Sequence, residues 1–118
     1  MNEHELWVCK WVEKADSDYQ TALIVLQSHQ PIADAICFHC QQCVEKYLKA
    51  FLLSLGRPVS RTHDLEKLLL ECMGIDPSFS RWSEACFLLN NYAVGIRYPD
   101  DEDEFQVEQA EEALHLTQ

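Results

Sequence analysis

Residues 33–55 read ADAICFHCQQCVEKYLKAFLLSL and contain neither proline nor glycine. Apolar side chains recur in this stretch at steps of three and four residues, which is the periodicity of one face of an α-helix. The apolar arc is so broad that other helices must cover it, so the stretch is predicted to be the central helix. Gly56, followed by Arg57 and Pro58, is a stop signal for that helix. The apolar positions are Ile36, Cys37, Cys40, Cys43, Val44, Tyr47, Leu48, Phe51, Leu52 and Leu55.

A polar strip occupies the rest of the same predicted helix. In it, Glu45 precedes Lys49 by four residues, which is the favourable order for an ion pair on a helix. The strip consists of Asp34, Gln41, Gln42, Glu45, Lys46 and Lys49.

The helical periodicity continues before the central stretch. Residues 4–28 predict a first long helix, with Asn2 and Glu5 as a capping box. The link to the central helix is short, so the two helices are predicted to form an antiparallel hairpin.

Shorter helices are predicted in the second half of the chain. Thr62 is the expected N-cap of a third helix, which Gly74 closes. Asp76, followed by a proline, starts a fourth helix that is expected to run to about Gly95, and residues 107–116 indicate a last one. The fold class is therefore all-α, and residues 1–118 are predicted to form one domain. It is an up-and-down bundle of four to five helices, two of them long, N-terminal and antiparallel.

Length and composition exclude several classes of protein. The chain has 118 residues, the length of one domain, and it has no run of 18 apolar residues, so no membrane span is expected. Its N-terminus is acidic, unlike that of a signal peptide, and a cytoplasmic location is predicted. The six cysteines mostly occupy apolar helical positions, which favours reduced, buried thiols over disulfides.

The net charge of −11 is unevenly distributed. Residues 100–118 carry eight acidic side chains and no Lys or Arg. An acidic surface repels phosphate backbones. The charge therefore favours a basic partner protein, or contact with nucleic acid only through a small local basic site. The alternative is that the acids simply keep the protein in solution.

No metal or cofactor is expected from the sequence motifs. Cys37, Cys40 and Cys43 have a spacing similar to that of an iron–sulfur run. On a helix, at about 100° per residue, their sulfurs fan out over roughly 120° and do not converge, so they are interpreted as small core residues. With only three glycines, the chain has no Gly-rich phosphate loop, and it has no zinc-protease or serine-hydrolase motif.

Two places in the chain are candidate phosphate sites. His63 lies at the expected N-terminus of a helix, near Arg61, where a structural hydrogen bond is the alternative role. Arg97 lies at the expected end of the fourth helix and is followed by Tyr98 and a proline. Its planar guanidinium suits phosphate because it can form two hydrogen bonds, although a cap on the last helical carbonyls is the alternative. His39 is interpreted as a core or interface residue.

Three motifs together resemble the HEPN domain family. The stretch FHCQQCVEKYLKA at residues 38–50 is similar to the second-helix signature of that family, and THDL at residues 62–65 to its next turn. The segment from Tyr92 to Pro99 is similar to the end of its fourth helix. The resemblance covers nearly the whole chain. It implies an all-α bundle that forms a homodimer and is encoded beside a minimal nucleotidyltransferase, as in toxin–antitoxin modules.

The resemblance also implies a chemistry. Many HEPN domains are metal-independent ribonucleases that use an Arg, four to six intervening residues and a His, with the ribose 2′-OH as the nucleophile. Arg97 matches the arginine of this motif, but Glu102 stands where the histidine is expected. A carboxylate among other acids repels RNA, so weak or no ribonuclease activity is predicted. The implied catalytic positions are Arg97 and Glu102, and the implied nucleotide- or phosphate-binding residues are Arg61, His63, Arg97 and Tyr98.

The residues support three hypotheses of function. The first is a dimeric partner of a nucleotidyltransferase in a toxin–antitoxin-like or nucleotide-handling module, in which Tyr98 offers a hydroxyl that the partner could modify. The second is an active metal-independent endoribonuclease toxin that uses Arg97, with Glu102 or His63 as the base. The third is a nucleotide-binding module whose phosphate ligands are Arg57, Arg61, His63 and Arg97.

Overall fold

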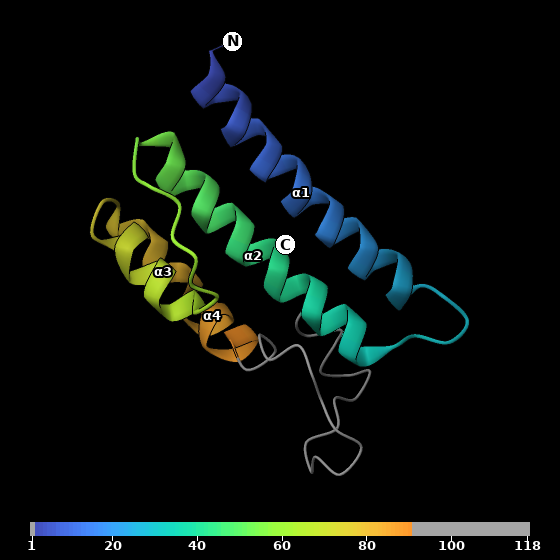
Figure 1. Cartoon of the computed structure of the whole chain (residues 1–118). Coiled ribbons are helices and arrows are strands. Elements are labelled where there is room, and N and C mark those ends of the chain that lie inside the picture. Colours follow the sequence, from blue (N-terminus) through green and yellow to red (C-terminus); the bar gives the residue numbers. More distant parts are fainter. Residues whose placement is uncertain (1, 91–118) are drawn as a thin grey trace.

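The computed structural model describes residues 2–90, and within them every regular element is helical. In chain order the elements are α1 (Glu3–Leu26), α2 (Ala33–Ser54), α3 (Leu65–Met73), the 3₁₀-helix η1 (Pro77–Trp82) and α4 (Ser83–Asn90). Figure 1 shows α1 and α2 side by side as the long pair, with α3 and α4 packed on the other side of α2. The predicted all-α bundle with two long N-terminal helices is confirmed.

The first hairpin follows the signals in the sequence. Asn2 caps α1, because its side-chain oxygen accepts a hydrogen bond of 2.7 Å from the backbone N–H of Glu5. A short link joins α1 to α2, and the two helices run antiparallel along most of their lengths (Figure 1). Because α2 is covered by α1 on one side and by α3 and α4 on another, it is the central helix, as its broad apolar arc predicts.

Gly56 ends α2 as predicted. Its φ of 79° is the only positive φ in residues 2–90, and glycine adopts this left-handed conformation without the steric cost of a Cβ. The N–H of Arg57 donates to the carbonyl of Leu52 (3.1 Å) and the N–H of Gly56 donates to that of Leu53 (2.9 Å). These two bonds form a Schellman cap, which turns the chain back along α2.

The predicted N-cap of α3 is wrong by two residues. The Oδ1 atom of Asp64 accepts from the backbone N–H groups of Glu66 (3.0 Å) and Lys67 (3.4 Å), so Asp64 is the cap. The hydroxyl of Thr62 instead accepts from the N–H of Asp64 and shapes the preceding turn. A carboxylate is favoured over a hydroxyl at this position because it also interacts with the positive end of the helix dipole.

The fourth helix begins where the sequence predicts but in a tighter form. The Asp76 side chain accepts from the backbone N–H of Ser78 (3.0 Å). Hydrogen bonds from the side chain and then the backbone of Ser78 hold the pKa of Asp76 below its ordinary value. Residues 77–82 form 3₁₀ turns before α4 starts at Ser83. The predicted end near Gly95 and the predicted helix at 107–116 lie outside the described residues.

The core between the helices is built around α2. Its fully buried large apolar side chains come from α2, α3 and α4, whereas α1 contributes the buried Ala22 and the partly buried Tyr19, Leu23, Val25 and Leu26. The six cysteines form no disulfide, and all except the half-buried Cys9 are buried, as predicted. Within residues 2–90, no helix combines the length and apolar character needed to cross a membrane. The fully buried side chains of this core include Ile36, Cys37, Cys40, Leu65, Leu68, Cys72, Cys86 and Leu89.

Candidate functional site

Half of the polar strip of α2 lies inside the protein. Gln41, Glu45 and Lys49 are only 0%, 3% and 4% exposed, although all three are polar or charged. They are spaced by four residues and so lie in one row along the helix. Buried charges are costly unless they are paired and hydrogen-bonded, so the side chains of this row need polar partners inside the protein.

Glu45 is the centre of the buried polar cluster. Its Oε1 lies 2.9 Å from Nδ1 of His63, and its Oε2 accepts a hydrogen bond of 3.3 Å from Nζ of Lys49. The Nε2 of Gln41 lies 3.4 Å from the same Oε1. Both carboxylate oxygens therefore have partners, and the predicted pair between Glu45 and Lys49 is confirmed.

Gln41 also positions the backbone that carries His63. Its Nε2 donates to the main-chain carbonyl of His63 (3.2 Å), and its Oε1 accepts from Nε2 of Gln42 (2.8 Å). The loop between α2 and α3 is thus held against α2 through both the backbone carbonyl and the side chain of His63. Its partners, Gln41 and Glu45, are far from His63 in the sequence.

The imidazole of His63 is the part of the cluster that meets solvent. Its side chain is 68% exposed, whereas the Glu45 side chain beneath it is 4% exposed. An ionised carboxylate can only accept hydrogen bonds, so Nδ1 of His63 is assigned as the donor. The Nε2 atom is then left for a ligand or for proton transfer. This is the geometry of an imidazole oriented by a carboxylate, a group that can bind phosphate or act as an acid or base.

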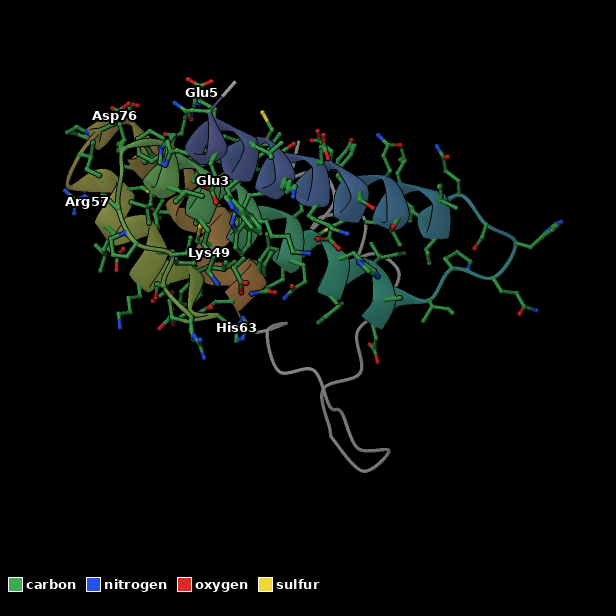
Figure 2. All side chains as sticks on the ribbon, turned by 45° about the horizontal axis from the view of Figure 1, so that its top comes forward. Glu3, Glu5, Lys49, Arg57, His63 and Asp76 are labelled. Carbon is green, nitrogen blue, oxygen red and sulfur yellow. The ribbon has the colours of Figure 1, made fainter. Side chains whose placement is uncertain are left out.

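The two arginines of the loop between α2 and α3 differ in their position relative to His63. Arg61 is exposed and lies two residues before His63. Arg57 lies at the other end of the loop, and Figure 2 shows it well away from His63 and Lys49. Among residues 2–90, neither arginine forms an ion pair. Arg61 is therefore close to His63 along the chain, and the structure leaves Arg57 apart from His63.

The end of α4 is tied to the residues that follow His63. The Oδ1 of Asn90 accepts from the N–H of Leu65 (2.9 Å), and its Nδ2 donates to Oδ1 of Asp64 (3.0 Å). Asn90 therefore lies beside the N-terminus of α3. The predicted site residues Arg97, Tyr98 and Glu102 lie outside the described residues.

A second polar cluster lies between α1 and α2. Asp18, which is 8% exposed, pairs through Oδ1 with Nδ1 of His39 (2.9 Å) and through Oδ2 with Nζ of Lys46 (2.5 Å). His39 therefore lies at the interface of the two long helices, in agreement with its interpretation as an interface residue. The Tyr47 hydroxyl also donates to Asp16 across this interface.

Sequence reasoning recognised the members of the polar strip but not their common partner. His63 and Glu45 are 18 residues apart, and neither periodicity nor a local motif links them. The available signal was the spacing of Gln41, Glu45 and Lys49 at four-residue steps on an otherwise apolar helix. Three polar residues in one row beside a buried arc indicate a buried polar contact with another segment.

The family model of the HEPN domain matches residues 8–118. The chain therefore belongs to the HEPN domain family, as its three motifs predict. Searches among curated proteins and among solved structures gave no match. Membership suggests a nucleotide-binding or ribonuclease-type module, and members of this family often form dimers.

Proposed function

We propose that this HEPN protein is the dimeric partner of a nucleotidyltransferase in a toxin–antitoxin-like or nucleotide-handling module. In this proposal it binds the phosphates of a nucleotide or RNA and has weak or no ribonuclease activity. The observation that carries the phosphate site is the exposed imidazole of His63, which is held on the buried carboxylate of Glu45. Arg61, two residues before it, is exposed and forms no ion pair within residues 2–90.

The chemistry of these groups suits a phosphate. The guanidinium of Arg61 can form two hydrogen bonds to phosphate oxygens, and Nε2 of a protonated His63 can donate one more. We assign Arg97 and Tyr98 to the same site. Arg97 follows Asn90 by seven residues, a reach of up to about 25 Å for extended chain, and Asn90 contacts the residue next to His63.

The sequence of the motif argues against efficient RNA cleavage. Glu102 stands at the position of the family's catalytic histidine and is flanked by other acids. A carboxylate in that setting repels the phosphodiester that it would have to approach. Binding without fast cleavage is therefore the function that these residues support best.

Isothermal titration with ATP tests the phosphate site. We expect His63→Ala and Arg61→Ala each to weaken binding by about tenfold, the loss of a charge-assisted hydrogen bond. Arg57→Ala removes the same charge from the same loop, away from His63, and serves as the matched control. Unchanged affinity in both site variants would refute the site.

Co-expression tests the partnership. The protein should co-purify with the product of a neighbouring nucleotidyltransferase gene, and size-exclusion chromatography with light scattering should give the mass of a dimer for the protein alone. Intact mass after incubation with that partner and ATP reports whether Tyr98 gains a nucleotide, with Tyr98→Phe as the control. A monomer that fails to bind the partner would contradict the proposal.

One observation favours a second candidate, the metal-independent endoribonuclease. The Glu45–His63 pair has the form of a general base oriented by a carboxylate, which could replace the histidine absent at Glu102. RNA cleavage at low salt with a chelator distinguishes the two functions. Activity lost in both His63→Ala and Arg97→Ala supports the ribonuclease, and cleavage by Glu102→His alone supports a preserved site without its base.

A further inference from the structure

One face of the α1–α2 pair gathers basic and aromatic side chains in an otherwise acidic protein. Three of the five lysines and two of the three tryptophans of the chain line a hollow of about 450 Å³ between the two long helices. A fourth lysine, the buried Lys49, lies against the Trp11 ring. We call this surface the lysine–tryptophan face; its residues are Trp7, Lys10, Trp11, Lys14 and Lys46.

The tryptophans of this face interact with the lysines. The Nζ of Lys10 lies 4.7 Å from the ring centroid of Trp7, and the Nζ of Lys49 lies 5.8 Å from that of Trp11. Trp7 is 50% exposed, so half of this large aromatic side chain meets solvent. Tryptophan is enriched at interfaces because its ring combines a large apolar surface with one polar N–H. The Trp7 ring thus keeps surface available for a further stacking partner, next to an ammonium group.

The charge of the face is not fully neutralised. Lys46 pairs with Asp18, and Lys49 pairs with Glu45. Lys10 and Lys14 form no ion pair within residues 2–90, and Glu13 is the acid that lines the hollow with them. The face therefore presents two ammonium groups that can bind an anion.

The lysine–tryptophan face is linked to the His63 site through buried side chains. Lys49 contacts the Trp11 ring on one side and the Glu45 carboxylate on the other, and Glu45 holds His63. Figure 2 shows Lys49 and His63 on the same side of the molecule. A strand with several phosphates offers an anionic group to each of the two places.

We propose that the lysine–tryptophan face binds single-stranded nucleic acid and leads it toward His63. Bases stack on the exposed ring of Trp7, and Lys10 and Lys14 bind the phosphates. The proposal rests on the phosphate site proposed at His63, to which it adds a second contact on the strand. Aromatic rings beside cations are the usual platform for single strands, because every base has a face that stacks.

An acidic peptide would use the lysines but gains less from an exposed tryptophan ring. A double helix keeps its bases inside the stack, so it cannot use the ring either. The combination of ring and ammonium groups therefore selects a flexible strand with exposed bases over both.

Fluorescence anisotropy with a labelled 12-nucleotide oligouridine tests this surface. We expect Trp7→Ala to weaken binding by about tenfold, the loss of one stacked base. The slope of log affinity against log salt should become shallower by about 0.7 for each lysine removed in Lys10→Ala and Lys14→Ala. Phe87→Ala and Lys67→Ala are the matched controls, since Phe87 is an exposed aromatic side chain and Lys67 an exposed lysine on other helices.

Each alternative outcome has a defined meaning. If oligouridine affinity is unchanged in Trp7→Ala and in the Lys10→Ala/Lys14→Ala double variant, the proposal is overturned. If only His63→Ala and Arg61→Ala weaken it, the phosphate site stands and the face does not. The proposal also fails if poly-glutamate binds the face and oligouridine does not, or if Trp7→Ala converts a dimer into a monomer, which would make the face a subunit interface. Circular dichroism checks that each variant is folded.

Discussion

At the scale of single residues, Glu45 joins a buried cation to an exposed imidazole. Its carboxylate contacts Lys49 through one oxygen and His63 through the other. Transferring such charges from water costs several kcal/mol per ion, and well-packed apolar residues often serve stability as well or better. The burial of Glu45 and Lys49 is therefore better explained by the orientation of His63 than by a gain in stability. Glu45 holds the His63 ring in one orientation at the surface.

The cost of breaking the buried pair is the first prediction. Glu45→Ala leaves the ammonium of Lys49 buried without a carboxylate, and we expect it to lower the free energy of unfolding by about 3–5 kcal/mol. The double variant Glu45→Leu/Lys49→Met removes both charges and should regain most of that loss. Urea denaturation measures both. If Glu45→Ala were as stable as the wild type, the ammonium group of Lys49 would have to be hydrated in that variant, which would contradict the prediction.

The orientation of the imidazole is the second prediction. Because Glu45 accepts from Nδ1, neutral His63 should carry its proton on Nδ1, the less common form of a free histidine. Long-range ¹H–¹⁵N spectra distinguish the two tautomers. Glu45→Leu should move the proton to Nε2, whereas His39, held by Asp18, should not change. A proton on Nε2 in the wild type would contradict the assigned hydrogen bond.

At the scale of the elements, the N-terminus of α3 is a junction of three segments. Asp64 caps the helix, and Asn90 at the end of α4 bonds both to Asp64 and to the N–H of Leu65. The same junction follows directly after His63. The capping hydrogen bonds therefore fix the loop that presents the imidazole as well as the start of the helix.

The identity of the cap is the third prediction. Asp64→Ala removes a cap and the bond from Asn90, and we expect a loss of about 1–2 kcal/mol in the free energy of unfolding. Thr62→Ala removes only the hydroxyl that shapes the preceding turn. It should lower the free energy of unfolding by only a small fraction of the loss expected for Asp64→Ala. Thermal and urea unfolding of the two variants compare them directly. A larger loss in Thr62→Ala would restore Thr62 as the cap.

At the scale of the whole molecule, the core contains five buried cysteines. Burial raises the pKa of the Cys43 thiol from 9.0 to about 12, and it raises the pKa values of Cys72 and Cys86 from 9.0 to about 11. The folded core therefore keeps these thiols protonated at a pH where the unfolded chain has begun to lose their protons. They serve as small apolar residues and have little thiolate character.

The stability at alkaline pH is the fourth prediction. Above pH 9 the unfolded chain binds fewer thiol protons than the folded protein, so the free energy of unfolding falls as pH rises. The contribution is fully present below pH 9 and is lost as pH rises through about 11–12. Urea unfolding at several pH values measures the slope.

The control for this slope is a variant without one of the thiols. Cys43→Ala removes one titrating group, so its stability should fall less steeply between pH 9 and 11 than that of the wild type. Equal slopes would mean that other groups, such as the lysines, account for the alkaline loss.

Local signals in the sequence were sufficient for most of the helices. The uninterrupted periodicity of residues 33–55 and the stop at Gly56 predict α2 to within one residue of its observed end, Ser54. Asn2 and Asp76 were identified correctly as caps because their partners lie within three residues. The choice of Thr62 as the cap of α3 was wrong, since both Thr62 and Asp64 are good N-caps and only the packed loop selects Asp64.

The sequence by itself determined the helical fold, the central position of α2 and the membership in the HEPN family, because each depends on periodicity or on motifs of a few residues. The tertiary structure alone decided that Glu45 meets His63, that Arg57 lies away from this site, and that lysines and tryptophans of two helices share a face. The physical reason is distance along the chain. Contacts between residues 18 or more apart depend on the direction of a loop and on which polar groups can be paired inside the core. A local sequence pattern predicts neither of these.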